Sequence, residues 1–402
     1  MGPMKILYHH RIASKDGQYV HVEAIVSALR RLGHEVVLTG PELGQNQGFG
    51  GEAGWVRWLK RWVPGVLYEV AEFGYSFFDY FRLSKAIRTF RPDFVYERYN
   101  LFFVSGLWAR QRHRLPWLVE VNAPLFDERC AYGGIKLKRL ARWTERSVWR
   151  GADRVFAVTQ VLAERVAREG VARTRLTVTP NGIDPVQFEG LPSRAEAKRS
   201  LGLEGKVVLG FTGFVRPWHG LERVLDAVQR LQVPIHFLLV GDGPARVALE
   251  ERAHALGLAA NITFTGVIQR SQVIGYVNAF DIALQPDVVA YASPLKLFEY
   301  LAAGCAVVAP DHPNIREILV HDVNAWLFDP DAPGSFVDAV VGLANDAALR
   351  QRLGTAARET IQQRHLTWLD NAERILASAQ ALTISTNSNG RQPVLHPGQG
   401  HE

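Results

Sequence analysis

The stretch from Ser293 to Ala309 reads SPLKLFEYLAAGCAVVA and carries the clearest structural signal in the chain. It predicts a turn, a short helix that contains Glu299, a glycine stop at Gly304 and then an apolar strand. The start of such a helix presents unpaired backbone N–H groups and a positive dipole end, which suits a phosphate. Glu299 lies one to two turns into the helix, where a carboxylate can accept hydrogen bonds from ribose hydroxyls. The stretch therefore predicts a nucleoside diphosphate site formed by Ser293, Pro294, Leu295, Lys296, Leu297 and Glu299.

Strands and helices alternate along the chain, which predicts an α/β fold with two similar halves. The first half opens with an apolar strand at 5–8, a helix at 20–32 and a strand at 35–39. The second half begins again with a strand at 207–211, a helix at 221–231 and a strand at 235–240. Two such series predict two Rossmann-like, doubly wound domains. Further apolar runs predict strands at 94–96, 117–121, 155–158, 176–178, 262–264, 282–284 and 306–308.

The composition is that of a globular protein, with 402 residues, 47% hydrophobic and 21% charged. The net charge of +6 favours phosphate-bearing substrates or an anionic membrane surface, and no nucleic-acid-binding motif occurs, so we expect no nucleic acid. Cys130 and Cys305 show no metal-ligand spacing, so we expect no metal site. The sequence shows no signal-peptide pattern and no long apolar run, so we expect a cytoplasmic protein.

Two glycine-containing loops follow strands of the second half. The segment 213–220, GFVRPWHG, contains Arg216, which can bind phosphate through its fork of N–H donors. It also contains His219, which can supply a hydrogen bond, or a charge if protonated. The segment 241–244 reads GDGP, and its glycines would let the chain approach a ligand closely. We therefore expect Arg216, His219, Gly241, Asp242 and Gly243 to bind the same ligand as Glu299.

Polar residues also cluster after the first strand, at the start of the first helix and after the strand at 117–121. Ligands of open α/β sheets bind at the carboxyl ends of the strands. We therefore expect Gly17 and Gln18 to face the transferred phosphate or the acceptor, and His10, Arg11 and His21 to bind the acceptor. The alternative is that the histidines are solvated loop residues.

These segments resemble the donor-site signature of retaining glycosyltransferases with the GT-B fold, in particular glycosyltransferase family 4. The resemblance extends over most of the chain, from about Lys5 to about Leu382. It implies two Rossmann-like domains that face a central cleft, with the nucleotide base held near Val267, mainly by backbone contacts. It also implies a donor domain at 187–366 and an acceptor domain at 1–186.

The resemblance further implies that a helix at 367–382 crosses back to the first domain. The segment between Pro185 and Leu201 is rich in proline, glycine and charge, and we expect it to contain the linker. The polar residues 383–402 are expected to form a disordered tail.

The chain departs from the family pattern at several site positions. Tyr291 stands where the family has the first of two glutamates eight positions apart, and His219 stands at the usual lysine position. Arg216 lies two positions later than the usual arginine. Asn122 replaces a histidine, so a general base is unavailable there and we expect Asn122 to orient sugar hydroxyls of donor or acceptor. We expect the chemistry to depend on Arg216, Glu299, Asn122 and Glu120, unless Glu120 is paired with Arg98 or Arg129.

Aromatic residues are concentrated between residues 55 and 81. Trp55, Trp58 and Trp62 recur at helical spacing among basic residues, and six further aromatic residues follow at 73–81. They predict either an amphipathic helix on a bilayer surface or aromatic residues that pack as core or line an acceptor pocket. Because relatives often use this domain to approach lipid-linked acceptors, peripheral contact with the inner face of the membrane stays open.

The implied function is that of a retaining, metal-independent glycosyltransferase without a cofactor. Its donor would be a UDP- or GDP-linked sugar, and its acceptor a hydroxyl of a glycan, glycolipid or small-molecule glycoside. Two alternatives stay open. A non-catalytic sugar-nucleotide-binding protein is favoured by Tyr291 and Asn122. A nicotinamide-dependent oxidoreductase is disfavoured, because no G-x-G-x-x-G follows the first strand.

Overall fold

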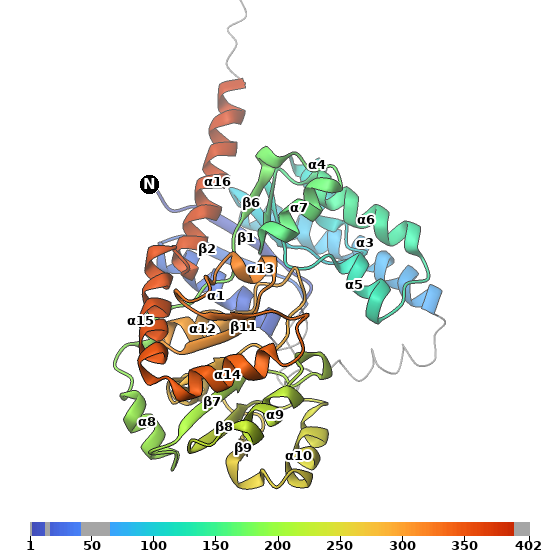
Figure 1. Cartoon of the computed structure of the whole chain (residues 1–402). Coiled ribbons are helices and arrows are strands. Elements are labelled where there is room, and N and C mark those ends of the chain that lie inside the picture. The colour runs from blue at the N-terminus through green and yellow to red at the C-terminus, as the bar shows by residue number, and fades with distance from the viewer. Residues whose placement is uncertain (1, 13–16, 42–64, 390–402) are drawn as a thin grey trace, which may run out of the picture.

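The computed structural model describes residues 2–12, 17–41 and 65–389. It contains two parallel sheets of six strands each, with helices on both faces of each sheet (Figure 1). The predicted fold of two Rossmann-like units is therefore confirmed. The tryptophan-rich segment at 55–62 lies outside the described residues.

The first sheet has the strand order β2-β1-β3-β4-β5-β6. Its strands are β1 (Lys5–His9), β2 (Glu35–Thr39), β3 (Phe94–Arg98), β4 (Trp117–Val121), β5 (Arg154–Ala157) and β6 (Leu176–Val178). The helices around it are α1 (Gly17–Arg31), α3 (Gly65–Phe90), α4 (Ser105–His113), α5 (Leu125–Tyr132), α6 (Lys138–Gly151) and α7 (Gln160–Arg168), followed by the short 3-10 helix η1 (Arg173–Arg175).

The second sheet has the strand order β12-β11-β10-β7-β8-β9. Its strands are β7 (Val207–Thr212), β8 (Ile235–Val240), β9 (Ile262–Phe264), β10 (Ile282–Leu284), β11 (Ala306–Pro310) and β12 (Trp326–Phe328). The helices that accompany it are η2 (Pro185–Phe188), α8 (Arg194–Ser200), η3 (Pro217–His219), α9 (Glu222–Arg230), α10 (Arg246–Ala255), η4 (Ala259–Asn261), α11 (Arg270–Asn278), α12 (Leu295–Ala302), α13 (Pro313–Arg316), α14 (Ser335–Asn345) and α15 (Ala347–Gln363).

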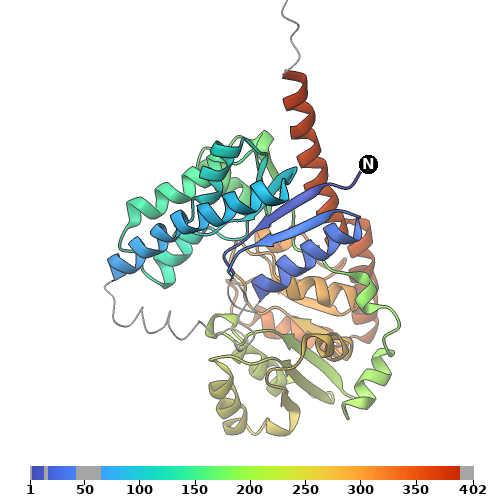
Figure 2. The same cartoon turned by 180° about the vertical axis from the view of Figure 1, so that it is seen from behind.

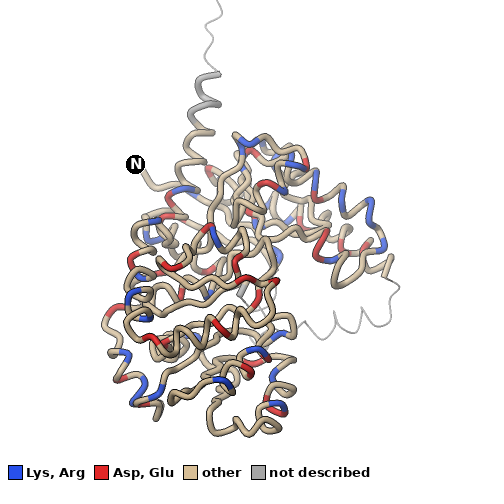
Figure 3. The backbone as a smooth tube through the Cα atoms, in the orientation of Figure 1, with Lys and Arg blue, Asp and Glu red and all other residues tan. Residues whose placement is uncertain are grey.

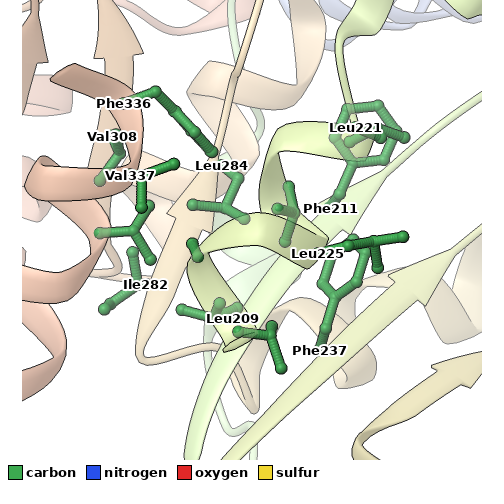
Figure 4. Close-up of a cluster of buried hydrophobic side chains, with 14 of the residues drawn as sticks. Leu209, Phe211, Leu221, Leu225, Phe237, Ile282, Leu284, Val308, Phe336 and Val337 are labelled. Carbon is green, nitrogen blue, oxygen red and sulfur yellow. The ribbon is translucent and has the colours of Figure 1, made fainter. Parts of the chain in front are cut away.

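Each sheet is covered on both faces, which explains why its strands are continuous apolar runs. Every residue of β8 is buried, and so is every residue of β11. One face of the second sheet packs against α9 and α14, where Leu209, Leu225 and Val337 belong to one cluster (Figure 4). The sheets therefore form rigid platforms that hold the loops at their carboxyl edges.

The last helix, α16 (Trp368–Asn389), returns to the first unit and packs against α1 (Figures 1 and 2). Trp368 and Ile375 share a buried cluster with Ile25 and Leu29 of α1. The predicted tail at 383–402 begins inside this helix, because α16 continues to Asn389, so that boundary is wrong. Residues 390–402 lie outside the described residues.

Two further features differ from the pattern-based expectations. The expected linker contains helix α8, whose start is fixed by reciprocal hydrogen bonds between Ser193 and Glu196. The edge strand β12 pairs with β11 and was not predicted, because its three residues give no periodic signal. Neither difference changes the position of the loops that follow β7 to β10.

Candidate active site

The candidate site lies where the carboxyl ends of β7, β8, β9 and β10 meet the start of α12. Two loops pack backbone against backbone at this edge. A Cβ atom on Gly241 would lie 2.1 Å from the carbonyl oxygen of Gly213, and one on Gly243 would lie 2.3 Å from that of Val215. Gly241 also has a φ angle of 140°, a conformation that other residues rarely adopt. The glycines thus allow the two loops to approach each other, whereas the sequence suggested close approach to a ligand.

Lys296 extends from the first turn of α12 to the loop after β7. Its Nζ atom lies 3.7 Å from the centroid of the Phe211 ring, in a cation–π contact. Burial lowers the pKa of Lys296 to about 7, and the nearby Glu299 carboxylate opposes that shift. The ammonium group is therefore held against β7, on the side where the glycine loops meet.

Glu299 lies one turn further along α12 and is partly buried. Burial raises the pKa of Glu299, while Arg270 at the start of α11 and Lys296 lower it. Its carboxylate is thus at the edge predicted for a ribose.

Val267, expected beside the base, is 62% exposed. Thr265 fixes the adjacent loop, because its hydroxyl accepts a hydrogen bond from the Gly241 N–H at 3.2 Å.

Arg216 and His219 occupy the loop after β7. The exposed Arg216 guanidinium lies over the rings of Phe214 (4.9 Å) and Trp218 (4.8 Å). Burial, and then repulsion from Lys296 and Arg216, lowers the pKa of His219 to about 3, so its imidazole is neutral. Trp218 also stacks on Tyr132 of α5 with ring centroids 6.2 Å apart, which joins the two units across the site.

Asp242 is engaged by the protein itself. Its carboxylate accepts a hydrogen bond from the Gly243 N–H at 2.7 Å and pairs with Arg246 at 3.2 Å. Arg246 in turn contacts Glu250 at 2.8 Å. Asp242 therefore fixes the shape of its loop.

A chain of polar contacts links the start of α12 to the first unit. The Asn181 backbone N–H donates to the Ser293 hydroxyl at 3.0 Å, and the Asn181 side chain donates to the Ser293 carbonyl at 2.5 Å. The Asn181 side-chain oxygen lies 2.7 Å from His21 Nδ1, and His21 Nε2 lies 2.8 Å from Glu120. His21 is 5% exposed, so it is buried and not a solvated loop residue.

Glu120 is buried and fully paired. Arg98 donates to it at 2.9 Å, and so does the Tyr96 hydroxyl. Burial raises the pKa of Glu120, but His21, Arg98 and the Asn122 side chain together lower it to about 2. The pairing with Arg98 considered from the sequence is the one found. We therefore correct the expectation for Glu120: it holds His21 and Asn122 in place and is not a free carboxylate in the cleft.

The remaining residues expected on the acceptor side lie at the end of β1 and the start of α1. His10 is buried, and burial is the main cause that lowers its pKa to about 4. Arg11 lies over the rings of Tyr75 (5.4 Å) and Phe103 (5.6 Å). Gly17 begins α1, and Gln18 is exposed in the same turn. The structure thus places Arg11 against aromatic residues of α3 and of the loop between β3 and α4.

Sequence reasoning missed a buried ionic cluster around His9. Its Nε2 lies 2.8 Å from Asp79, and its Nδ1 lies 3.0 Å from Glu97. Burial opposes protonation, but the two carboxylates raise the pKa of His9 to about 10, so both ring nitrogens donate. The partners are 70 and 88 residues away in the sequence, and no local spacing could reveal them.

Tyr291, at the position of the family's first glutamate, packs against the core of the first unit. Burial and the neighbouring Glu128 of α5 raise the pKa of its hydroxyl. Within the described ranges, no three His, Cys, Asp or Glu side chains are grouped as metal ligands would be.

Comparison with known families assigns both units. Residues 16–182 match a glycosyl transferase 4-like domain, and residues 193–360 match the glycosyl transferases group 1 family. The chain belongs to these glycosyltransferases. The match to these families confirms the prediction of a glycosyltransferase, and the oxidoreductase alternative is wrong.

Curated relatives of this glycosyltransferase have different substrates. A 2-deoxystreptamine glucosyltransferase of Streptomyces kanamyceticus is 32% identical over 151 residues, 36% of this chain and 39% of the relative. A GDP-mannose-dependent alpha-mannosyltransferase of Mycolicibacterium smegmatis is 24% identical over 304 residues, 75% of this chain and 76% of the relative. The similar region thus spans well under half of the first relative and about three quarters of the second.

Solved structures share the fold of this glycosyltransferase. Anabaena HepE in complex with UDP-glucose superposes with a TM-score of 0.70 at 19% identity, over 95% of this chain and 100% of that one. Sucrose-phosphate synthase from Thermosynechococcus elongatus gives a TM-score of 0.72 at 17% identity, over 95% and 100% of the two chains. These similarities confirm the GT-B fold.

Proposed function

We propose that this glycosyltransferase transfers a sugar from a nucleoside diphosphate sugar to an acceptor hydroxyl, with retention of the anomeric configuration and without a metal ion. The observation that carries the proposal is the grouping of the start of α12, Glu299 and Arg216 at one edge of the second sheet. A diphosphate is bound by a guanidinium and by helix amides, and this edge offers both.

Most of the predicted residues have a role in this proposal. The backbone N–H groups of Leu295 and Lys296 bind the diphosphate, after the turn formed by Ser293 and Pro294. The Leu297 N–H donates to the Pro294 carbonyl at 3.1 Å and fixes the helix start, and Glu299 accepts hydrogen bonds from the ribose. The loops with Gly241, Asp242, Gly243 and Val267 enclose the base. On the opposite side, His10, Arg11, Gly17, Gln18, His21 and Asn122 shape the acceptor and sugar site.

The proposed mechanism uses no protein nucleophile. The departing diphosphate accepts the proton of the acceptor hydroxyl on the same face of the sugar, while the protein orients both substrates and stabilises the developing charge. The state of Glu120 supports this mechanism, because a carboxylate paired with Arg98 and His21 is unavailable for attack on the sugar. Arg216 would stabilise the negative charge that grows on the leaving group.

The donor is proposed to be UDP- or GDP-linked. The support is that one curated relative is named for GDP-mannose and one structure of the same fold contains UDP-glucose. The acceptor is proposed to be a glycan, a glycolipid or a small-molecule glycoside. We also propose that the acceptor domain spans 1–186 and the donor domain 187–366, since β6 ends at Val178 and β7 begins at Val207.

The experiment is incubation of the purified protein with UDP-, GDP- and ADP-sugars, with and without EDTA. The expected result is slow donor hydrolysis that EDTA leaves unchanged and that releases a sugar of the donor's anomeric configuration, read by NMR. Inverted product or loss of activity in EDTA would contradict the proposed chemistry. Binding without any turnover, in the presence of candidate acceptors, would identify the non-catalytic alternative.

We further propose that the first domain works in the cytoplasm, against the inner face of the membrane. Helix α3 exposes Phe77, Phe78 and Phe81, which are 54%, 64% and 68% exposed. Basic residues recur along α6 (Figure 3), and Arg139, Arg142 and Arg146 line one surface hollow with the exposed Trp143. Aromatic and basic side chains together suit the interface of an anionic bilayer. No helix in the described part of the chain has the length and apolarity to cross a membrane.

A further inference from the structure

The loop after β7 contains too little positive charge for a diphosphate. Arg216 is its single Lys or Arg residue, and the guanidinium is exposed between two aromatic rings. His219, the other candidate cation in this loop, is held neutral by burial and by its two cationic neighbours. A neutral imidazole offers one N–H and does not compensate the charge of a phosphate.

Lys296 brings a cation to this loop from the opposite side. The rings of Phe211 and His219 are 5.2 Å apart, and Lys296 Nζ lies 3.7 Å from the same Phe211 ring. A Cβ atom on Gly213 would lie 3.5 Å from Nζ, so the lysine reaches the first residue of the loop. Phe211 thus has the neutral imidazole and the ammonium group as neighbours, and both lie at the end of β7.

Among the residues that the structure describes, the ammonium group has no ion-pair partner. Among the described residues, no carboxylate forms a salt bridge with Lys296. The Glu299 carboxylate, one turn away on α12, raises the pKa of Lys296 without forming a salt bridge to it. Arg270 also lowers the pKa of Glu299, so the Glu299 carboxylate interacts with two cations. A partly buried cation without a paired carboxylate is suited to an anionic ligand.

We infer that Lys296 supplies, from α12, the positive charge that His219 cannot supply, and that it binds the diphosphate of the donor and of the departing nucleotide. The inference rests on the proposed function. It makes Lys296 a binding residue through its side chain, in addition to the backbone N–H groups of α12. A lysine at position 219 could then supply the same positive charge to the diphosphate.

Binding of the diphosphate should be coupled to protonation of Lys296. A nearby dianion favours the charged ammonium, so a fraction of the lysine takes up a proton when the nucleotide binds at pH 7.5 to 8.5. The charged and titratable groups that face Lys296 are Glu299 on its own helix and Arg216 and His219 in the loop after β7. The pKa of His219 lies far below this range, so the proton taken up on nucleotide binding is assigned to Lys296.

The test compares UDP and GDP binding by wild type, Lys296→Met, Lys296→Arg and the double variant Lys296→Met/His219→Lys. Calorimetric titrations in two buffers with different ionisation enthalpies give both affinity and proton uptake. Lys296→Met should bind about 10- to 100-fold more weakly, as expected for one charged hydrogen bond. The double variant should recover at least about tenfold of that loss, and Lys296→Arg should keep its affinity but lose the proton uptake.

Three outcomes would overturn the inference. They are unchanged binding by a folded Lys296→Met variant, a double variant as weak as Lys296→Met, and unchanged proton uptake in Lys296→Arg. The arginine variant keeps the test decisive if the methionine variant does not fold. If Glu299→Gln weakens binding while Lys296→Met does not, the nucleotide site stands and this inference fails. If wild type binds no nucleotide, the proposed function fails as well.

Discussion

Replacing His9 by glutamine should change how the stability of the first unit depends on pH. His9 is fully buried between Asp79 and Glu97, and its pKa is about 10 in the folded protein. In the unfolded chain it returns to about 6.5. Between these values the folded state binds more protons than the unfolded state, so the stability due to His9 is full below pH 6.5 and is lost as pH rises toward 10.

The magnitude follows from the same linkage. One extra bound proton gives a slope of about 1.4 kcal/mol per pH unit, so the His9 contribution falls by about 2.7 kcal/mol from pH 7 to pH 9. Lys296 acts with the opposite sign, because its lowered pKa of about 7 makes stability rise through this window. Lys296 is partly exposed and His9 is not, so solvent weakens the Lys296 contribution more. The stability of the wild type should therefore fall from pH 7 to pH 9.

The assay is urea unfolding followed by tryptophan fluorescence at pH 7, 8 and 9. His9→Gln should lower stability at pH 7 by about 3–5 kcal/mol, the cost of leaving buried charges unpaired, and should remove the falling slope. If the two units unfold separately, the effect belongs to the first unit's transition. His10→Gln is the matched control, because burial already keeps His10 neutral throughout this range. A His9→Gln variant with the wild-type slope would refute the assignment of the charge.

The remaining predictions concern the site and the membrane. Glu299→Ala should weaken nucleotide binding by about 1.5–3 kcal/mol, measured by calorimetry, because a charged hydrogen bond to the ribose is lost. Arg216→Ala should lower kcat by at least about tenfold with little change in the unfolding midpoint, since the guanidinium is exposed. Trp218→Ala should raise KM severalfold while stability stays nearly constant, because the exposed stack between the units contributes only about 0.5–1.5 kcal/mol. The double variant Phe78→Ser/Phe81→Ser should float less with vesicles that contain about 30% anionic lipid, and high salt should reduce flotation of the wild type.

Each of these predictions has a result that contradicts it. A folded Glu299→Ala variant with wild-type affinity would remove the ribose contact, and full activity in Arg216→Ala would place that guanidinium outside the site. A KM that does not change in Trp218→Ala would mean that the stack does not shape the cleft. Flotation that survives both serine substitutions would exclude α3 from the membrane contact. The exposed Val247 on α10 is a matched control position for the serine variants.

The sequence predicted the fold well because its signals are local. Apolar runs such as those of β8 and β11 are short, continuous and bounded by turn residues, and buried parallel strands have this pattern. The segment with Glu299 and Gly304 could be recognised for the same reason, since a helix start and a glycine stop are encoded within a few positions. The helical part of 383–389 was missed because polar residues without clear periodicity gave no helix signal.

The full set of partners of the buried charges could not be predicted from the sequence. The sequence left Glu120 either as a free acid at a strand end or as a partner of Arg98 or Arg129, and only the fold selects Arg98 and adds Tyr96 and His21. The same holds for Lys296, whose neighbour Phe211 lies 85 positions earlier in the chain. In each case, the partners come from different strands or helices that meet at a sheet edge, which local spacing does not encode.

The most direct test of the central claim is a crystal structure of the protein with UDP or GDP, whichever binds more tightly. We expect the diphosphate to lie within hydrogen-bonding distance of the amides at Leu295 and Lys296, Lys296 Nζ to contact a phosphate oxygen, and Glu299 to contact the ribose. A nucleotide bound in another part of the protein, with the start of α12 and Lys296 making no contact to it, would contradict this assignment of the donor site.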